Sequence, residues 1–427
     1  MSHEIFRQLP AGAQAEIQRG KASVVEVSFA NSQFEDISNK SAQRTSLRLI
    51  QHGRLSSVSS SKPRSEQALL DKAMKTAPFG SPVKYDFPSS ASLAEIPMFD
   101  PAVPELDSAT MVDMADDLVQ SLVGYDRRIQ VMAGVSRSVR EVSMQNSAGF
   151  AGSFRQTGWQ LYLGGILVQG DDMLWLGESQ SSCELRQEFA PLKQAVKQQF
   201  VWAKETVAME PGSYPVIFVP DEVQHLITPF LASLNGKQIA RGLSPWIGKL
   251  GQDLLDKRIT LLDDGTLPYH PSSRPFDREG VPTRRQTLIE QGVAKQYLLD
   301  LQSAHELALS PTGNGSEGGP APHHLLLSPG QTALADLIGR IDRGLIIYSS
   351  MGAWAGNPLT GNVSGTISMG LKIERGQIVG RVKDCMFSLN SFEHFRSRLI
   401  DCSQETKQIG QATYPYVALD EVVISTK

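Results

Sequence analysis

Short runs in which apolar and polar residues alternate occur through the first half of the chain and predict β-strands. Residues 22–32, 45–60 and 140–168 are rich in β-branched and aromatic residues, which suit a sheet that is buried on one face. Residues 111–123 and 188–207 instead repeat apolar residues at helical spacing. These two stretches therefore predict amphipathic helices among the strands.

The breaks between these elements predict how the chain divides. Residues 85–107 are rich in Pro and Ser and predict a long irregular connection inside the first part. After the second helix, Pro211-Gly212 precede an apolar strand, so we predict domains over residues 1–208 and 209–427. The second part alternates hairpins with short helices. The predicted class is therefore α+β, with two domains that each have an antiparallel or mixed sheet and segregated helices.

Three hairpins share one turn chemistry. Their turns are centred on His52-Gly53, Gln291-Gly292 and Arg375-Gly376. Tight two-residue turns need positive φ angles, which glycine adopts without steric cost. We predict that each of these glycines has a positive φ.

Composition and charge narrow the function. With 427 residues, 41% of them hydrophobic, the chain can bury a sizeable core. It has no apolar run of membrane-spanning length and no signal peptide, and its three cysteines fit a reducing compartment, so we expect a cytoplasmic protein that does not bind a membrane. The net charge of -4 and the lack of a Lys/Arg stripe argue against nucleic-acid binding.

The most conspicuous metal motif fails at its second ligand. His305-Glu306 starts like the helix of a zinc peptidase, but Leu309 and Ser310 occupy the positions where the second histidine should lie. We therefore interpret the pair as an exposed helical pair. The adjacent His323 and His324 precede a run of leucines and predict a loop that enters a strand.

The other chemical motifs also fail on context. Gly313-x-Gly315-x-x-Gly318 has the spacing of a dinucleotide loop, but prolines follow it where a helix should begin. Leu250 replaces the Ser or Thr of a phosphate-binding loop, and no nucleophile elbow occurs. Cys402 has no neighbour that would lower its pKa, which favours a structural cysteine.

Glycine and polar residues in the second part form the strongest candidate site. Small residues near Gly280, Gly313 and Gly361 could leave backbone groups free to pair with an extended peptide at a sheet edge. The alternative is that these are turns with positive φ. The candidate site residues are Asp277, Glu279, Gly280, Gly313, Asn314, Gly315, Gly361, Ser364 and Gly365.

Several of these segments together resemble the TldD/PmbA family, once called modulators of DNA gyrase. They are "LLDDGT", "SRPFDREGVPTRRQTLIEQGVAKQYLLD", "SPTGNG" and "GNVSGTISMGLKIERGQIVG", together with the earlier "SLRLIQHGRLSSVSSS", "MQNSAGF" and "PGSYPVIFVPDEV". The resemblance spans nearly the whole chain. It implies a two-domain α+β protein that encloses a cavity on dimerisation.

The resemblance also implies two branches, of which one carries zinc on a HExxxH helix and cleaves unfolded peptides. The other branch, which is PmbA/TldE-like, lacks these ligands and pairs with the first. In this chain the corresponding interval, residues 221–236, is apolar, and we expect Pro229 to interrupt its helix. His225 is alone there and is interpreted as a surface residue. Cys402 lies near the third ligand of the zinc branch but lacks its glycine-rich setting.

Three hypotheses follow. The first is a non-catalytic PmbA/TldE-like subunit with no cofactor of its own, which helps to present an extended peptide to a TldD-like partner that carries the zinc. The second is a self-contained hydrolase with a divergent site such as His323, His324 and Cys402. The third is a homodimeric peptide-binding protein without a protease partner.

Overall fold

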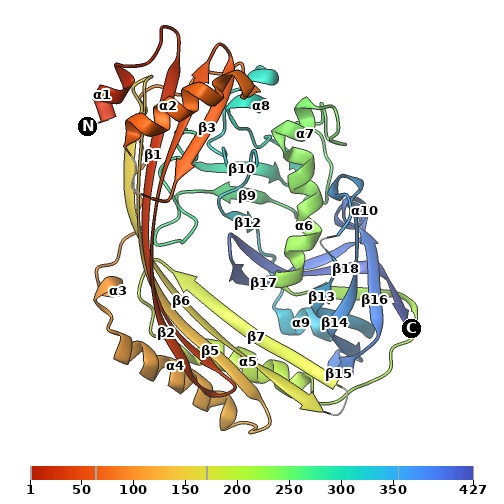
Figure 1. Ribbon diagram of the computed structural model, residues 1–427. Helices are drawn as coiled ribbons and strands as arrows, with labels where there is room; N and C mark the ends of the chain where they lie inside the picture. Colours follow the sequence, from red (N-terminus) through yellow and green to blue (C-terminus); the bar gives the residue numbers. More distant parts are fainter. Residues whose placement is uncertain (1, 63–64, 170–171, 354, 427) are drawn as a thin grey trace. The chain divides into compact units, whose positions relative to one another are not determined.

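The computed structural model in Figure 1 describes residues 2–62, 65–169, 172–353 and 355–426. The chain forms two compact units that are not continuous in sequence. Unit 1 comprises residues 1–197, 265–284 and 299–319, and unit 2 comprises residues 198–264, 285–298 and 320–427. Two segments from the second half of the sequence therefore belong to unit 1. The predicted domains, 1–208 and 209–427, stay a prediction.

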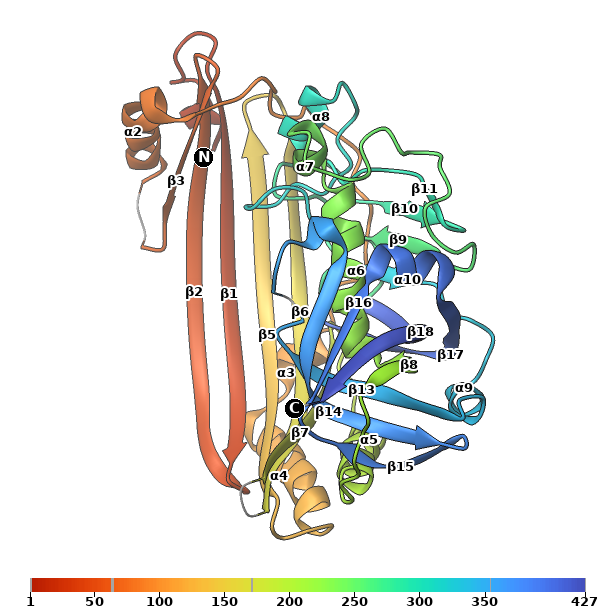
Figure 2. The same ribbon diagram turned by 90° about the vertical axis from the view of Figure 1, so that its right-hand side faces the viewer.

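Unit 1 contains one antiparallel sheet of seven strands in the order β4-β3-β2-β1-β5-β6-β7. The strands are β1 (Gln14–Ala30), β2 (Gln33–Gln51), β3 (Arg54–Ser60), β4 (Ser81–Pro82), β5 (Gln130–Asn146), β6 (Ala151–Gln169) and β7 (Asp172–Ser182). The longest strands, β1, β2, β5 and β6, run side by side in Figures 1 and 2. Alternation holds along β1, where Val25, Val27 and Phe29 are buried.

Unit 1 also contains helices, several of which pack on this sheet. They are α1 (Ser2–Phe6), α2 (Glu66–Thr76), η1 (Ala77–Phe79), α3 (Ala102–Glu105), α4 (Ser108–Val123), α8 (Leu301–Glu306) and most of α5 (Ala190–Trp202). Leu69, Leu70 and Ala73 of α2 pack with Leu47 and Leu49 of β2. This packing buries the apolar stripe of α2 against the sheet face from which Leu47 and Leu49 project.

Unit 2 contains a mixed sheet of eleven strands. They are β8 (Gly212–Phe218), β9 (Leu261–Asp264), β10 (Arg285–Glu290), β11 (Val293–Ala294), β12 (Leu325–Leu327), β13 (Arg343–Met351), β14 (Asn362–Glu374), β15 (Gln377–Val382), β16 (Cys385–Asn390), β17 (Leu399–Ile409) and β18 (Ala412–Thr426). Because β8 pairs with both β13 and β18, the strands β18-β16-β14-β13-β8 close into a ring. The helices of unit 2 are α6 (Pro220–Leu234), α7 (Gly236–Ala240), α9 (Leu334–Gly339), η2 (Pro358–Thr360) and α10 (Ser391–Ser397).

The predicted class is confirmed, since both units combine a sheet with separate helices. The strands predicted in residues 22–32, 45–60 and 140–168 occur as parts of β1, β2, β3, β5 and β6. The first predicted helix is α4, and the second ends at Trp202 rather than near residue 207. Residues 85–107 are irregular except for the four-residue helix α3 and one isolated bridge at Ser89.

The three hairpin turns are also as predicted. Gly53, Gly292 and Gly376 have φ angles of 67°, 79° and 74°, and the residue before each of them also has a positive φ. This combination is that of a type I′ turn, whose twist matches the twist of the flanking strands.

The prediction that Pro229 interrupts its helix is wrong. Helix α6 runs from Pro220 to Leu234 with Pro229 inside it. A proline removes one helical hydrogen bond, but Val223, Leu226 and Phe230 are fully buried around it, and this packing holds the helix together. None of the helices in the described ranges has both the length and the apolarity that crossing a membrane requires.

Candidate functional site

The candidate residues Asp277, Glu279 and Gly280 lie in a polar corner that unit 1 builds from residues 274–284. The side-chain amide of Gln156 on β6 donates to the carbonyl oxygens of Pro271 and Ser273, at 3.2 and 3.3 Å. The ring of Phe276 packs edge-on against the rings of Phe150 and Phe154. These contacts hold the segment on the sheet and fix where the next residue, Asp277, points.

The carboxylate of Asp277 organises the backbone around it. One oxygen accepts the amides of Glu279 and Val281 at 2.8 and 2.9 Å, and the other accepts the amide of Gly315 at 2.7 Å. Burial raises the pKa of Asp277 to about 6, and the three backbone donors offset only part of that shift. Asp277 therefore ties two loops together, and Gly280 closes the turn with a φ of 79°.

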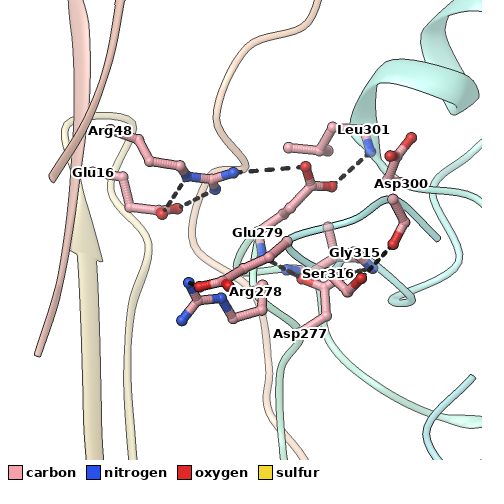
Figure 3. Close-up of polar contacts among 12 residues, drawn as sticks. Glu16, Arg48, Asp277, Arg278, Glu279, Asp300, Leu301, Gly315 and Ser316 are labelled. Carbon is pink, nitrogen blue, oxygen red and sulfur yellow. Dashed lines mark hydrogen bonds and ion pairs between the residues drawn. The ribbon is translucent and has the colours of Figure 1, made fainter. Parts of the chain in front are cut away.

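Glu279 lies between a backbone amide and an arginine, as Figure 3 shows. One carboxylate oxygen accepts the amide of Leu301 at 2.7 Å, and the other lies 3.6 Å from the guanidinium of Arg48. Burial raises the pKa of Glu279 to about 7, against the attraction of Arg48, and the neighbouring Asp277 raises it further. Glu279 and Asp277 are thus two buried acids that titrate near neutral pH.

The sheet of unit 1 also contains a largely buried ion pair, between Glu16 and Arg48, that the sequence pattern does not reveal. Arg48 on β2 and Glu16 on β1 face each other in the strand register and form two hydrogen bonds of 2.8 and 3.0 Å. The guanidinium also lies 5.1 Å from the centre of the Phe87 ring. Burial opposes the charge of Arg48, but the attraction of Glu16 and Glu279 outweighs it and raises the pKa of Arg48.

The only signal in the sequence for Glu16 and Arg48 is that each lies within a short apolar run, "AEI" and "LRL". Their pairing depends on the β1–β2 register, which the sequence pattern does not state. Tyr85, from the irregular connection, lies in the same charged environment. Burial and the negative charges of Glu279 and Glu16 raise its pKa.

The loop that contains Gly313, Asn314 and Gly315 packs against this corner. Gly313 has a φ of 77°, and a Cβ atom there would lie 2.4 Å from the carbonyl oxygen of Pro282. A Cβ atom at Gly315 would lie 2.6 Å from Glu279. Both positions therefore require glycine, and six of the nine predicted site residues come together in unit 1. The Gly315 amide is used by Asp277, so it does not point free toward a ligand.

The other three predicted residues, Gly361, Ser364 and Gly365, lie in unit 2. Gly361 has a φ of 79° where the short helix η2 meets β14. Ser364 and Gly365 pair with Ser388 and Phe387 of β16, and β14 lies between β16 and β13. Among the described strand pairings, β13 reaches β14 only as far as Thr366, so Ser364 and Gly365 are paired on the β16 side alone.

Helix α6 occupies the interval in which the resemblance places a zinc helix, and its residues do not fit zinc. It contains one histidine, His225, which is half-buried rather than at the surface and whose pKa is lowered by burial. Glu222 is buried, and its carboxylate accepts the amide and hydroxyl of Ser350 at 2.8 and 2.6 Å. A zinc helix needs two imidazoles and a glutamate base on one face.

The divergent set His323, His324 and Cys402 does not assemble a metal site either. Both histidines are buried, and their backbone amides donate to Asp263 at 2.7 and 3.0 Å. Burial raises the pKa of Cys402 to about 12, which disfavours the thiolate that binds metals. Among the residues that the structure describes, no three His, Cys, Asp or Glu side chains are grouped to bind a metal ion.

The remaining sequence motifs are placed as predicted. His305 and Glu306 are an exposed pair in the short helix α8. His323 and His324 lie in the bend that enters β12. After Gly318, the described residues 319–324 form no helix, so the glycine run lacks the helix that a dinucleotide loop requires.

The comparisons with known proteins agree on one protein family. A family profile described as the PmbA/TldA metallopeptidase C-terminal domain matches residues 211–426. An uncharacterized protein of Methanocaldococcus jannaschii is 24% identical over 97% of both chains. A metalloprotease PmbA homolog of Haemophilus influenzae is 26% identical over 86% of this chain and 82% of its own. The crystal structure of TldE from Thermococcus kodakarensis has the same fold, with a TM-score of 0.88, 24% identity and 96% of each chain covered.

Proposed function

Because the chain belongs to the PmbA/TldD family, we propose that it is a PmbA/TldE-like subunit that does not cleave peptides by itself. Its role is to complete a peptidase whose zinc is bound by a TldD-like partner, and to help hold an extended peptide there. The observation that carries this proposal is the composition of α6. Its inner face is formed by Val223, Leu226, Ile227, Phe230 and Leu234, all of them fully buried.

The physical argument is that hydrolysis at zinc needs ligands and a base on the same helix face. In α6 that face is part of the apolar core of unit 2. Phe230 contacts the rings of Trp246, Phe392 and Phe395. Two histidines inserted on this face would disrupt the packing. The inner face of α6 therefore stabilises the core of unit 2 and does not present metal ligands. In the part of the chain that the structure describes, the divergent-site alternative gains no support, because Cys402 is a buried thiol and the backbone amides of His323 and His324 donate to Asp263.

The test is expression of this chain with and without a family member that carries a HExxxH helix, ideally from the same genome. Native mass spectrometry would record subunit composition and bound zinc together, and an unfolded peptide would serve as substrate. We expect a mixed complex with zinc in the partner only, and cleavage that is abolished by a chelator. Stoichiometric zinc in this chain, or full cleavage by this chain alone, would refute the proposal. A stable homodimer that binds the peptide and forms no complex with the zinc-bearing family member would favour the third hypothesis, a homodimeric peptide-binding protein.

A further inference from the structure

Three arginines of unit 1 come together on one face of its sheet. Arg140 of β5 lies directly opposite Gln156 of β6, and side chains at such paired positions project from the same face at about 5 Å. Gln156 is bonded to the carbonyl oxygens of Pro271 and Ser273. Since Arg274 follows Ser273, the bonds of Gln156 bring Arg274 next to Arg140.

Arg278 reaches the same face from the corner that contains Asp277. Its guanidinium donates to the side chain of Gln18 on β1 at 2.6 Å, and Gln18 pairs with Met144 of β5. Met144 and Arg140 are an even number of residues apart on β5, so they point to the same side. We call Arg140, Arg274 and Arg278 the arginine cluster.

The arginine cluster is poorly neutralised. The guanidinium of Arg140 makes no hydrogen bond or ion pair within the described chain, and it lies 6.0 Å from the centre of the Phe154 ring. The guanidinium of Arg274 donates one long hydrogen bond, of 3.4 Å, to the carbonyl oxygen of Ser272. Arg278 pairs with Glu317, but this glutamate is largely exposed and also lies 3.4 Å from Arg44.

The nearest buried acid, Asp277, does not satisfy the arginine cluster, because its oxygens accept three backbone amides. The charges of the three arginines repel one another. Partial desolvation of its guanidinium and the charge of Arg278 lower the pKa of Arg140, and burial, Arg140 and Arg278 lower the pKa of Arg274 despite the attraction of Asp277. A site with several guanidinium groups and too few acids is suited to bind an added anion.

We propose that the arginine cluster is a binding site for a carboxylate of the peptide that the protein holds. The peptide rests on the proposed function, whereas the anion site rests on unit 1 alone. Guanidinium groups bind carboxylates through two parallel hydrogen bonds, and this geometry makes them selective as well as strong. The carboxylate has two possible sources in a peptide, which are its C-terminus and an acidic side chain.

The experiment measures peptide binding to the complete chain by isothermal titration calorimetry. The probes are one short extended peptide in three forms: with a free C-terminal carboxylate, with a C-terminal amide, and with that amide plus one internal glutamate. We expect at least one carboxylate form to bind about tenfold or more tightly than the plain amide, as charge-assisted hydrogen bonds imply. Preference for the first form identifies the C-terminus, and preference for the third identifies an acidic side chain.

The double variant Arg140→Gln/Arg274→Gln should bind all three forms with nearly equal affinity. Its Tm should not fall, because it removes unneutralised charges rather than a structural ion pair. The matched control is Arg128→Gln, an exposed arginine that pairs with Asp126 in the turn before β5, whose first residue lies roughly 33 Å along the strand from Arg140. It should retain the preference.

No preference in the native chain, or a preference that survives in the double variant, would overturn the inference. If the double variant does not fold, Arg140→Gln alone serves, because the Arg140 guanidinium forms no hydrogen bond or ion pair with the described residues that the fold would lose. Cleavage by the mixed complex with a zinc-bearing partner is scored separately. If the mixed complex cleaves the peptide but this chain shows no carboxylate preference, only the proposed carboxylate site is refuted. If this chain shows the preference but the mixed complex does not cleave, only the proposed role as a peptidase subunit is refuted.

Discussion

At the scale of single residues, the most unusual feature is a pair of acids that stay buried beside an arginine. Glu279 is 7% exposed and lies 3.6 Å from Arg48, yet burial outweighs this attraction in its pKa. The reason is that Arg48 is already engaged by Glu16 through two short hydrogen bonds. The Arg48 guanidinium therefore interacts with two carboxylates, and its interaction with Glu279 is the weaker of the two.

We predict that Glu279 makes the protein less stable as the pH rises. Its pKa is about 7 in the folded chain against an ordinary 4.5. Between these values the unfolded chain loses the proton first, so the folded state binds more protons and its free energy of unfolding falls as pH increases. The full difference is about 3 kcal/mol. Glu279→Gln keeps an acceptor for the Leu301 amide but has no such proton.

Thermal unfolding at about pH 4 and about pH 8 measures this effect. The stability of Glu279→Gln relative to the native chain should improve from the lower to the higher pH. Glu141→Gln is the control, because Glu141 is an exposed partner of Arg155 and should show no comparable change. An equal pH dependence in the native chain and in Glu279→Gln would contradict the prediction.

Of the four charged residues in this part of unit 1, the sequence pattern indicates only two. Asp277 and Glu279 stand out because a dense run of charges precedes Gly280 and Pro282, which predicts a polar corner. Arg48 and Glu16 do not stand out, because each is one charge in a strand, and burial on both sides of a strand depends on what covers it. Contacts between residues as far apart in sequence as Arg48 and Glu279 arise only once the strand register and the loop positions are fixed.

At the scale of elements, the three type I′ turns have the same local conformation but different surroundings. A Cβ atom at Gly53 would meet only the carbonyl oxygen of Val83, at 3.6 Å. At Gly292 it would lie 2.2 Å from the carbonyl oxygen of Leu255. The amide of Gly292 also donates to Ile259, and its carbonyl oxygen accepts the amide of Leu254. The turn after β10 is thus packed against the segment that precedes β9.

We predict that Gly292→Ala destabilises the protein much more than Gly53→Ala. Both variants force an alanine into positive φ, which costs about 1 kcal/mol. Gly292→Ala also places a methyl group against the Leu255 backbone, which cannot rotate away, so the turn must shift, at a cost of about 1–3 kcal/mol more. The Tm values of the two purified variants test this, with Gly53→Ala as the control. Equal losses of Tm would show that the backbone at Leu255 yields freely.

Helix α6 shows where pattern reasoning succeeds and fails for an element. The 3.6-residue spacing of its apolar residues indicates which face is buried. Val223, Leu226, Ile227, Phe230 and Leu234 on that face are fully buried, whereas Leu231 is half-buried. The proline rule failed, because it describes an isolated helix. In α6 the side chains of Leu226, Ile227 and Phe230 around Pro229 are fully buried, and this tertiary packing outweighs one missing hydrogen bond.

In the whole molecule, each of the two units is built from three separate stretches of the chain. Sequence patterns locate a change of composition near residue 208, but they do not show that residues 265–284 and 299–319 return to unit 1. That return depends on long-range contacts, such as those of Gln156 with the 270–273 segment and of Phe276 with Phe150. Polar and aromatic residues in loops carry no periodicity that would predict such contacts.

We therefore predict that residues 1–208 do not fold stably when expressed alone. Without Phe276, the apolar cluster of Val142, Met144 and Phe150 loses a fully buried aromatic ring, and loss of such a ring alone costs about 3–5 kcal/mol. The fragment should bind a hydrophobic dye and lack a cooperative unfolding transition, whereas co-expression with residues 209–427 should restore both a soluble complex and cooperative unfolding. A fragment that unfolds cooperatively by itself, near the Tm of the whole chain, would instead show that residues 1–208 are an independent domain and that the returning segments contribute little to its stability.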